Sequence, residues 1–423
     1  MLSIHYVHEH KDEIIARLSK RGISACEMIE ALIEKDNQRK KLQHTLDAIQ
    51  ASLNQTSKQI GDLLKQGLKE EAEKAKQQTQ TIKEEIKEKE EQLVVIEKDL
   101  QVQLYNIPNA PYQLVPAGNS ADDNIEIRNG GIIPELGSDA IPHWDLARKF
   151  DLIDFELGVK ITGSGFPVYK GKMARLQRAM VNFLLDENTR AGYVEYVPPL
   201  LVNEASGYGT GQLPDKEGQM YYMPADDLYL IPTSEVPLTN FFRDEILKSD
   251  DLPVKLTAYT PCFRREAGSY GKDVRGLNRL HQFDKVEIVQ VVHPDTSYDV
   301  LETMVSHVEG ILMKLKLPYR ILRLCGGDMG FASAMTYDFE VFSAAQKRWL
   351  EVSSVSNFES FQANRMKLRF KQANDKPQLV HTLNGSSLAF PRILAALMEN
   401  NQTSDGIQLP EVLHPYTGFE RLA

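Results

Sequence analysis

The sequence predicts an α+β protein in two parts. An N-terminal antiparallel coiled-coil hairpin of helices is followed by a domain of antiparallel β-strands with helices. Apolar residues recur with heptad spacing over residues 28–63 and again over 68–100, and such repeats are typical of coiled coils. Two alternating segments, one from Lys255 and one around Phe283 to Glu287, flank a glycine-rich basic loop and predict paired strands. Helical periodicity predicts the helices of the second part, over residues 144–155, 172–191 and 294–317.

Length and composition favour two domains. The chain has 423 residues, of which 42% are hydrophobic, and this is enough for a sizeable core. No run of about 18 apolar residues occurs, and the first residues lack the features of a signal peptide, so we expect a cytoplasmic protein with no membrane partner. The three cysteines form no CxxC pair, which argues against a disulfide framework or a thiolate zinc site. The net charge of -10 argues against indiscriminate nucleic-acid binding.

The predicted hairpin turns near residues 65–67, so each helix has about 36 residues and a length of roughly 54 Å. Basic and acidic residues balance along it, and this charge pattern does not single out RNA over dimerisation or a spacer role. Residues 105–124 contain three prolines and then turn polar, which is typical of a linker. We therefore expect domains at residues 1–110 and 111–423.

The two strands around the basic loop carry the strongest functional pattern. Side chains alternate across a strand, so Arg264 and Glu266 are predicted to share one face, as are Phe283, Lys285 and Glu287 on the return strand. The loop between them contains glycines among cations, which suit a polyanion such as ATP: Gly268, Gly271, Lys272, Arg275, Gly276 and Arg279. The alternative is a hairpin whose charges are merely solvated.

The strings FRREAGSYGKDVRGL and RLHQFDKVE resemble motif 2 of class II aminoacyl-tRNA synthetases, in the form found in bacterial seryl-tRNA synthetases. The long helix 172–191, the strand after it and Pro199 resemble motif 1. The segment LVHTLNGSSLAFPRILAALMENNQ resembles motif 3 and places Arg392 in the first turn of a helix. The resemblance covers essentially the whole chain, with departures at Gly165, Arg265, Val355 and Pro391.

This resemblance implies an antiparallel sheet of six to seven strands and a two-step reaction. Serine attacks the α-phosphorus of ATP to give seryl-adenylate and pyrophosphate, and the seryl group then passes to the 3′ end of tRNA(Ser). The resemblance further implies that Mg²⁺ assists, that the helical hairpin grips the tRNA and that the enzyme is a homodimer. Whether tRNA(Sec) is also served stays open.

Matching positions imply the nucleotide contacts. Arg264 would hold the α-phosphate and Arg392 the γ-phosphate, which makes these two arginines the predicted catalytic residues. Glu266 would bind the adenine amino group, and Phe283 would stack on the ring. The other predicted ATP contacts are Leu280, Arg265, Val352 and Ser353, together with the metal ligands Glu351 and Ser354.

The predicted Mg²⁺ ligands raise a geometric question. Glu351 and Ser354 are three residues apart and therefore lie on opposite faces of an ideal strand. Joint coordination of one ion consequently requires a β-bulge or a strand end between them.

The implied serine pocket is built from short polar segments. Glu287 and Thr233 would bind the ammonium group, with Ser234 and Glu235 adjacent at the start of a helix. Asn384 and Ser386 would bind the hydroxyl. From the residues alone, Thr233 and Ser234 are equally well explained as an ordinary helix cap.

Three other functions compete with this one. A class II synthetase for threonine or proline shares the motifs, but such relatives carry a C-terminal anticodon-binding domain, and only about 20 residues follow the motif 3 helix here. A synthetase-like protein that charges a carrier protein lacks the long hairpin. A non-catalytic interaction protein built on a synthetase domain would not need Arg264, Glu266, Glu287, Glu351 and Arg392.

Overall fold

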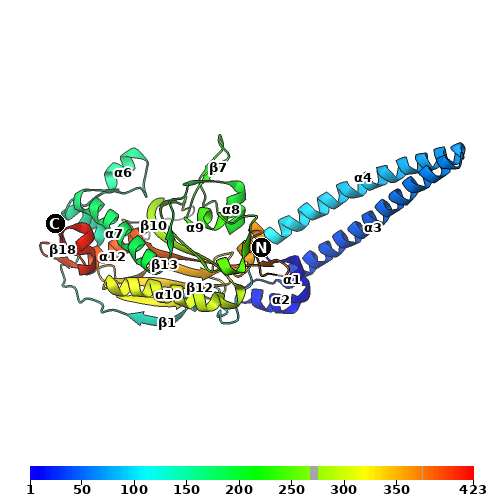
Figure 1. The fold of residues 1–423 in the computed structure, drawn as a ribbon. Helices are drawn as coiled ribbons and strands as arrows, with labels where there is room; N and C mark the ends of the chain where they lie inside the picture. The colour runs from blue at the N-terminus through cyan, green and yellow to red at the C-terminus, as the bar shows by residue number, and fades with distance from the viewer. Residues whose placement is uncertain (267–274, 374) are drawn as a thin grey trace. The chain divides into compact units, whose positions relative to one another are not determined.

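The computed structural model describes residues 1–266, 275–373 and 375–423 (Figure 1). Its internal contacts divide the chain into two units. The larger one comprises Met1, Lys20–Gly22 and Pro108–Ala423, and the smaller one comprises Leu2–Ser19 and Ile23–Ile107. The assignment of residues 1–110 and 111–423 to separate domains stays a prediction.

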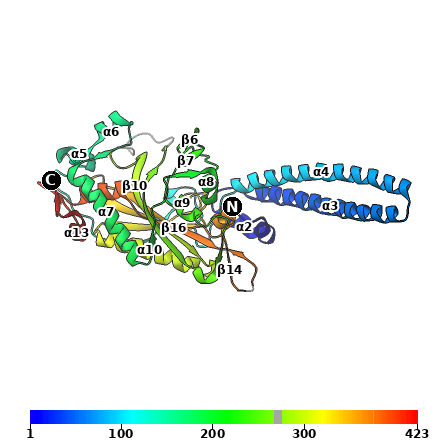
Figure 2. The ribbon, with the colours of Figure 1, turned by 45° about the horizontal axis from the view of Figure 1, so that its top comes forward.

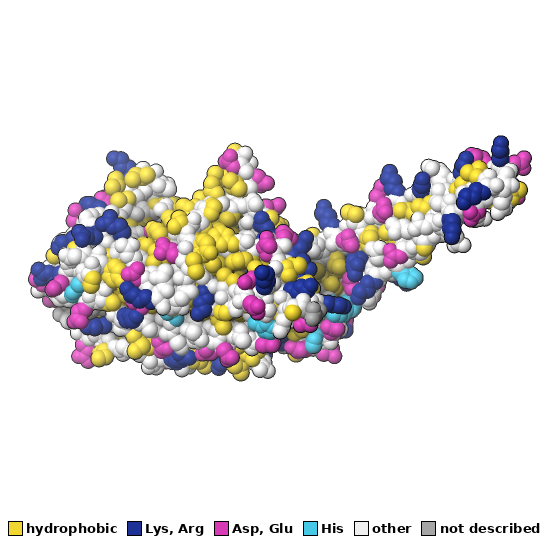
Figure 3. Space-filling view, in the orientation of Figure 1, with side chains coloured by type: hydrophobic (Ala, Val, Ile, Leu, Met, Phe, Trp, Pro, Cys, Tyr) yellow, Lys and Arg dark blue, Asp and Glu magenta, His cyan; other side chains and the backbone are white. Residues whose placement is uncertain are grey.

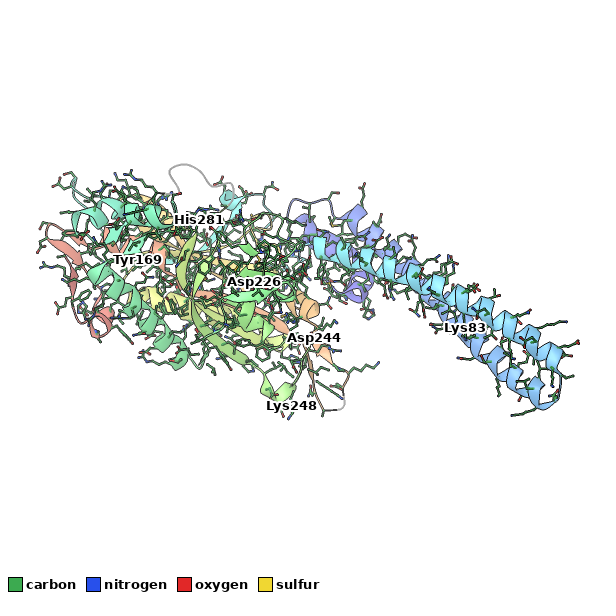
Figure 4. All side chains as sticks on the ribbon, turned by 90° about the horizontal axis from the view of Figure 1, so that it is seen from above. Lys83, Tyr169, Asp226, Asp244, Lys248 and His281 are labelled. Atoms are coloured by element: carbon green, nitrogen blue, oxygen red, sulfur yellow. The ribbon has the colours of Figure 1, made fainter. Side chains whose placement is uncertain are left out.

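The smaller unit is built on two long antiparallel helices, α3 (Cys26–Lys65) and α4 (Lys69–Asn106), with α1 (Ile4–Glu9) and α2 (Lys11–Ser19) before them. The predicted hairpin is confirmed, with helices of 40 and 38 residues. Its seam buries residues that follow the heptad spacing: Leu32, Leu46, Thr56, Ala72, Ala75 and Leu100. Away from the seam the helices are polar, and Lys83 on α4 is one of the exposed side chains (Figure 4).

An eight-stranded sheet forms the centre of the larger unit, in the order β1-β11-β12-β13-β16-β10-β9-β4. All neighbours are antiparallel except β4 and β9. The predicted antiparallel sheet is confirmed. The expected number of six to seven strands was too low, because the edge strand β4, which pairs with β9 in parallel, extends the sheet to eight strands. The strands are β1 (Ile125–Gly130), β4 (Val194–Glu195), β9 (Val254–Phe263), β10 (Gln282–Val292), β11 (Tyr319–Arg323), β12 (Met335–Ser343), β13 (Arg348–Asn357) and β16 (His381–Ala389).

Three helices share one hydrophobic core with this sheet: α7 (Gly171–Arg190), α10 (Ser297–Lys314) and α12 (Phe390–Asn400) (Figure 2). Phe183 of α7, Leu312 of α10 and Leu397 of α12 are buried in it with Val286 and Ile288 of β10. The predicted helices 172–191 and 294–317 are therefore confirmed. The predicted helix 144–155 is shorter in the structure. Helix α5 (His143–Lys149) ends just before Asp151, whose positive φ is incompatible with a continuing helix, and strand β2 (Ile153–Asp154) follows.

Smaller elements surround the sheet. Leu238 of α9 (Glu235–Asn240) packs against β9 and β10 through Leu256, Ala258 and Val289. The remaining elements are α6 (Phe155–Ile161), β3 (Val168–Tyr169), β5 (Leu201–Asn203), α8 (Glu204–Thr210), β6 (Tyr222–Met223), β7 (Leu228–Leu230), β8 (Ile246–Lys248), α11 (Phe361–Met366), β14 (Arg369–Lys371), β15 (Gln378–Leu379), β17 (Gln402–Thr403), β18 (Gly406–Gln408), α13 (His414–Thr417) and β19 (Arg421–Leu422).

One exposed surface of the larger unit is apolar. Val194, Tyr196 and Val197 follow the long helix α7 and are 56%, 40% and 89% exposed, and Phe241 beside Tyr196 is 41% exposed. Figure 3 shows apolar side chains gathered on the face of this unit that carries α9. In the described part of the chain, no helix combines the length and apolarity needed to cross a bilayer.

Candidate active site

A buried polar cluster lies where the start of α9 meets β10 and β16. The ammonium group of Lys285 lies 2.8 Å from the Thr233 hydroxyl and 2.5 Å from the Glu287 carboxylate. Ser386 donates to the same carboxylate at 3.4 Å. Because all four residues are at most 8% exposed, these contacts are largely screened from water and stronger than surface ion pairs.

The cluster continues through Glu235. Gln362 of α11 donates to the Glu235 carboxylate at 2.6 Å, Asn384 forms a further hydrogen bond with it, and Thr382 donates to Gln362 at 2.7 Å. Burial, and then repulsion from Glu287, raise the pKa of Glu235 from its ordinary value of 4.5 to about 7. The structure therefore brings together five of the six residues predicted for serine.

The sixth, Ser234, occupies the N-cap position of α9 between Thr233 and Glu235, but its buried hydroxyl has no hydrogen-bond partner among the described residues. The Thr233 hydroxyl accepts a hydrogen bond from the Glu235 backbone at 3.2 Å, so this segment also acts as a local helix cap. The two readings of the segment, cap and binding site, are compatible, because Thr233 faces Lys285 as well.

Strand register explains why distant segments meet here. Glu287 of β10 pairs with Ser386 of β16, and Val289 pairs with Asn384, so the side chains of these neighbouring strands converge. A register shift between Lys285 and Glu287 follows from an irregularity in β16, where Leu388 has a φ of 79°. Such a conformation is rare for a branched residue, and bulges of this kind re-aim strands next to functional sites.

Arg264 corrects one expectation. Strand β9 ends at Phe263, and Glu266 has a φ of 49°, so Arg264 and Glu266 do not share a strand face as the alternation predicted. The Arg264 guanidinium instead lies 5.2 Å from the centre of the Phe283 ring, and its Nε donates to the Pro232 carbonyl at 3.4 Å. Among the described residues it has no carboxylate partner, which leaves a cation beside the Thr233 segment for an anionic ligand.

The other residues of this loop are placed as follows. Glu266 is paired with Arg279. Arg265 lies 5.6 Å from the ring of Tyr221, which also contacts His281 at 3.4 Å; His281 is labelled in Figure 4. Leu280 is buried in the main core. The predicted loop residues Gly268, Gly271 and Lys272 lie outside the described residues.

The bulge required at the predicted Mg²⁺ site is present. In the β12–β13 pairing, Ser354 faces Asp338 and Glu351 faces Glu340, with a register shift between them, so Val352 is the extra residue. Since Asp338 and Glu340 are two apart on a regular strand, the shift returns Glu351 and Ser354 to one face of the sheet.

Asp338 lies on the same face and was not predicted. It is hydrogen-bonded to Ser354, and its Oδ1 has no partner within the described chain. Burial and repulsion from Glu351 raise its pKa well above the ordinary value. No group of three or more His, Cys, Asp or Glu suited to a metal occurs in the described residues.

Arg392, in the first turn of α12, lies beside Glu351 of this predicted Mg²⁺ site. Its guanidinium donates to the carbonyl oxygens of Asn278 and Glu351, each at 2.9 Å, and lies 3.5 Å from the Glu351 carboxylate. Val352 is buried in the core and the Ser353 hydroxyl donates to the Ser386 carbonyl at 2.6 Å. Because the Val352 side chain packs in the core and the Ser353 hydroxyl is hydrogen-bonded, a nucleotide would contact these two residues only through their backbone atoms.

Sequence reasoning named Lys285 without giving it a role and missed Gln362 and Asp338. Lys285 was detectable, because strand alternation places it beside Glu287. Gln362 and Asp338 carry no local signal, because their partners are more than ten residues away.

Two family models match this chain. One is described as the seryl-tRNA synthetase N-terminal domain and matches residues 1–111, and the other as the class II tRNA synthetase core domain (G, H, P, S and T) and matches residues 222–401. Among curated proteins, the serine–tRNA ligase of Salinibacter ruber is 51% identical, over 100% of this chain and 99% of its own.

Solved structures agree. The seryl-tRNA synthetase of Pyrococcus horikoshii complexed with ATP superimposes with a TM-score of 0.94 at 30% identity, over 100% of this chain and 99% of that chain. The cytoplasmic serine–tRNA ligase of Naegleria fowleri in complex with AMP gives a TM-score of 0.88 at 25% identity, over 100% and 98%. The full-length identity and the two family models together show that this chain belongs to the seryl-tRNA synthetase family.

Proposed function

We propose that this chain is a serine–tRNA ligase that activates L-serine with ATP and transfers it to tRNA(Ser). The observation that carries the proposal is the buried cluster around Thr233, Glu235 and Glu287, next to Arg264, which has no carboxylate partner among the residues that the structure describes. The carboxylates of the cluster complement the ammonium group of an amino acid, and the Arg264 cation complements the α-phosphate with which the amino acid reacts. Its family membership and its relatives named serine–tRNA ligase support the same function.

Serine selection depends on hydrogen bonding in this small pocket. Asn384 and Ser386 lie next to Glu235 and Glu287 and supply polar groups for the substrate hydroxyl. A site built to hydrogen-bond a substrate hydroxyl rejects the analogue that lacks it by about 10⁴–10⁵. Alanine is excluded in this way.

The ATP site adjoins the serine site. Phe283 supplies a ring face for adenine beside Arg264, whose guanidinium suits the α-phosphate. Arg392 in the first turn of α12 suits the γ-phosphate, because positive charge and free N–H groups favour anions at a helix start. Glu266 would read the adenine amino group after releasing Arg279.

Mg²⁺ would be held by Glu351 and Ser354, which the bulge brings to one face. The Oδ1 of Asp338, beside Ser354, has no hydrogen-bond partner within the described residues, and a buried carboxylate oxygen of this kind fits a cation site. When bound, Mg²⁺ offsets negative charge on the phosphate oxygens. The first step needs no covalent nucleophile from the protein, because the serine carboxylate attacks the α-phosphorus and pyrophosphate leaves; the enzyme's part is positioning and charge stabilisation.

The pKa of Glu235 gives a prediction for serine binding. Below about pH 7 the pocket holds a proton on Glu235, which weakens its attraction for an ammonium group. KM for serine in ATP–pyrophosphate exchange should therefore be about tenfold higher at pH 6 than at pH 8. The Glu235→Gln variant should lose this pH dependence; an equal dependence in both proteins would contradict the assignment.

The raised pKa of Glu235 also predicts how the stability of the folded protein changes with pH. Because the folded pKa of Glu235 lies above its ordinary value, ionisation costs the folded protein free energy, and stability without serine falls as pH rises from about 4.5 to about 7. Serine, by supplying a cation, should stabilise the protein most above pH 7.

We also propose that the enzyme is a homodimer. The exposed apolar surface formed by Val194, Tyr196, Val197 and Phe241 supports this, because monomers rarely leave such residues clustered in water. Light scattering should give a mass of twice 47.9 kDa, and Val197→Asp should lower it; a monomeric parent protein would contradict the proposal.

The overall function is tested by charging. With ATP and serine, the protein should esterify tRNA(Ser) and leave tRNA(Thr) and tRNA(Pro) uncharged with their own amino acids. Charging with threonine or proline in place of serine would overturn the proposal in favour of another class II specificity.

A further inference from the structure

A buried pair outside the reaction centre connects two parts of the ATP site. His143, the first residue of α5, and Glu399, in the last turn of α12, are both fully buried. The imidazole Nδ1 lies 2.6 Å from the Glu399 carboxylate, whose same oxygen accepts the His143 backbone N–H at 2.9 Å. No residue predicted to touch serine or ATP belongs to this pair.

The other imidazole nitrogen binds the end of the basic loop. The backbone N–H of Leu277 donates to His143 Nε2 at 2.8 Å. Since Nε2 accepts this bond, the ring N–H lies on Nδ1 and is donated to Glu399. Burial alone would raise the pKa of Glu399, but hydrogen bonds from His143 and Ser343 outweigh it and lower the pKa, which keeps this carboxylate ionised.

Close approach at this point depends on glycine. Gly276 has a φ of 66°, and a Cβ built on it would lie 2.3 Å from His143 Nε2. The loop backbone is thus pressed against the imidazole, and Leu277 beside it is fully buried. On the outer side, Arg275 lies 4.6 Å from the centre of the Trp144 ring, which ties the same loop end to α5.

The next loop residue contacts Arg392. The carbonyl oxygen of Asn278 accepts a hydrogen bond from Arg392 Nε at 2.9 Å. A second route runs through Gln346, which donates to Glu399 at 2.9 Å and accepts from the Asn278 side chain at 3.1 Å. The contacts form a closed ring: α12 carries Glu399 at one end and Arg392 at the other, and His143 with the 277–278 backbone joins them.

We propose that His143 and Glu399 are positioning residues that hold the loop end 276–278 and, through it, the guanidinium of Arg392 for the terminal phosphates of ATP. This inference rests on the proposed function. A misplacement of about 1 Å at a phosphate-contacting group can cost 10²-fold in rate, so a rigid connection between loop and helix matters for the ATP end of the site. The serine cluster shares no residue with this ring.

The test is steady-state ATP–pyrophosphate exchange by the full chain, with ATP and serine varied separately, alongside the thermal shift caused by ATP alone. His143→Ala should lower kcat/KM for ATP by on the order of 10²-fold, leave KM for serine unchanged and reduce the ATP-induced shift. Glu399→Gln retains an acceptor for His143 Nδ1, so its KM for ATP should stay at the parent value. Glu399→Leu removes the acceptor and should behave like His143→Ala.

Two further variants keep the test decisive. Gly276→Ala leaves the buried pair intact but pushes the loop from the imidazole, so it should give the ATP-specific defect even if His143→Ala does not fold. As a control, His307→Ala removes a different imidazole, which is partly buried and contacts Asn188 at 2.8 Å, and should lower thermal stability without changing KM for ATP.

Equal rises in KM for ATP and serine, or a stability loss with normal ATP kinetics in both His143→Ala and Gly276→Ala, would reduce the pair to ordinary core packing and overturn the inference. A wild-type protein without serine-dependent exchange would instead contradict the proposed function.

Discussion

Replacing Arg264 with alanine should lower serine-dependent ATP–pyrophosphate exchange by about 10²–10³-fold, because one preorganised contact to developing charge is commonly worth about 2.7–4 kcal/mol. In the structure this guanidinium is anchored by the Pro232 carbonyl and the Phe283 ring, and within residues 1–266, 275–373 and 375–423 it has no carboxylate partner. The measurement is initial-rate exchange at saturating ATP and serine.

Arg128→Ala is the matched control for this variant. Arg128 lies on the edge strand β1 and is paired with Glu302 and Glu309, so its loss removes an arginine from the same unit without touching β9, β10 or β16. Its exchange rate should stay at the parent level. If Arg264→Ala exchanges at a similar rate, the α-phosphate contact belongs to another residue.

Deleting residues 30–100 and closing the gap should leave adenylate formation largely intact and abolish efficient charging of tRNA(Ser). All residues predicted for ATP and serine lie at or after Thr233. The deletion also spares Arg21, which belongs to the larger unit and donates to the carbonyl oxygens of Asn109 and Met329 at 2.9 and 3.0 Å. The buried residues that the deletion removes all belong to the smaller unit.

Exchange and charging should be measured on the same preparation, with light scattering and circular dichroism to establish that the shortened protein is folded. Charging that survives the deletion would show that the hairpin does not grip tRNA. Exchange that disappears from a folded protein would show that the hairpin supports the reaction centre, contrary to our proposal.

Periodicity predicted what depends on local sequence. Heptads located the hairpin, and strand alternation placed Lys285 and Glu287 on one face, as their 2.5 Å contact shows. The same rule failed for Arg264 and Glu266, because it assumes that a strand continues and β9 ends at Phe263. A strand end is decided by backbone pairing and by the positive φ of Glu266, and neither can be read from alternating polarity.

Bulges and long-range contacts could not be predicted from the sequence either. Glu351 and Ser354 share a face only because β13 has an extra residue opposite β12, and the sequence could state the need for a bulge but not its presence. Gln362 and His143 are ordinary residues of short helices whose partners, Glu235 and Glu399, lie 127 and 256 residues away. Such pairs become apparent only in the fold.

The central claim, that the buried cluster around Thr233, Glu235 and Glu287 binds serine for reaction with ATP, is tested most directly by amino-acid-dependent ATP–pyrophosphate exchange without tRNA. Serine, alanine, threonine and proline should be compared at equal concentration with the same protein. We predict exchange with serine and essentially none with the other three. Exchange with threonine or proline but not with serine, or no exchange with any amino acid by a folded protein, would contradict the account.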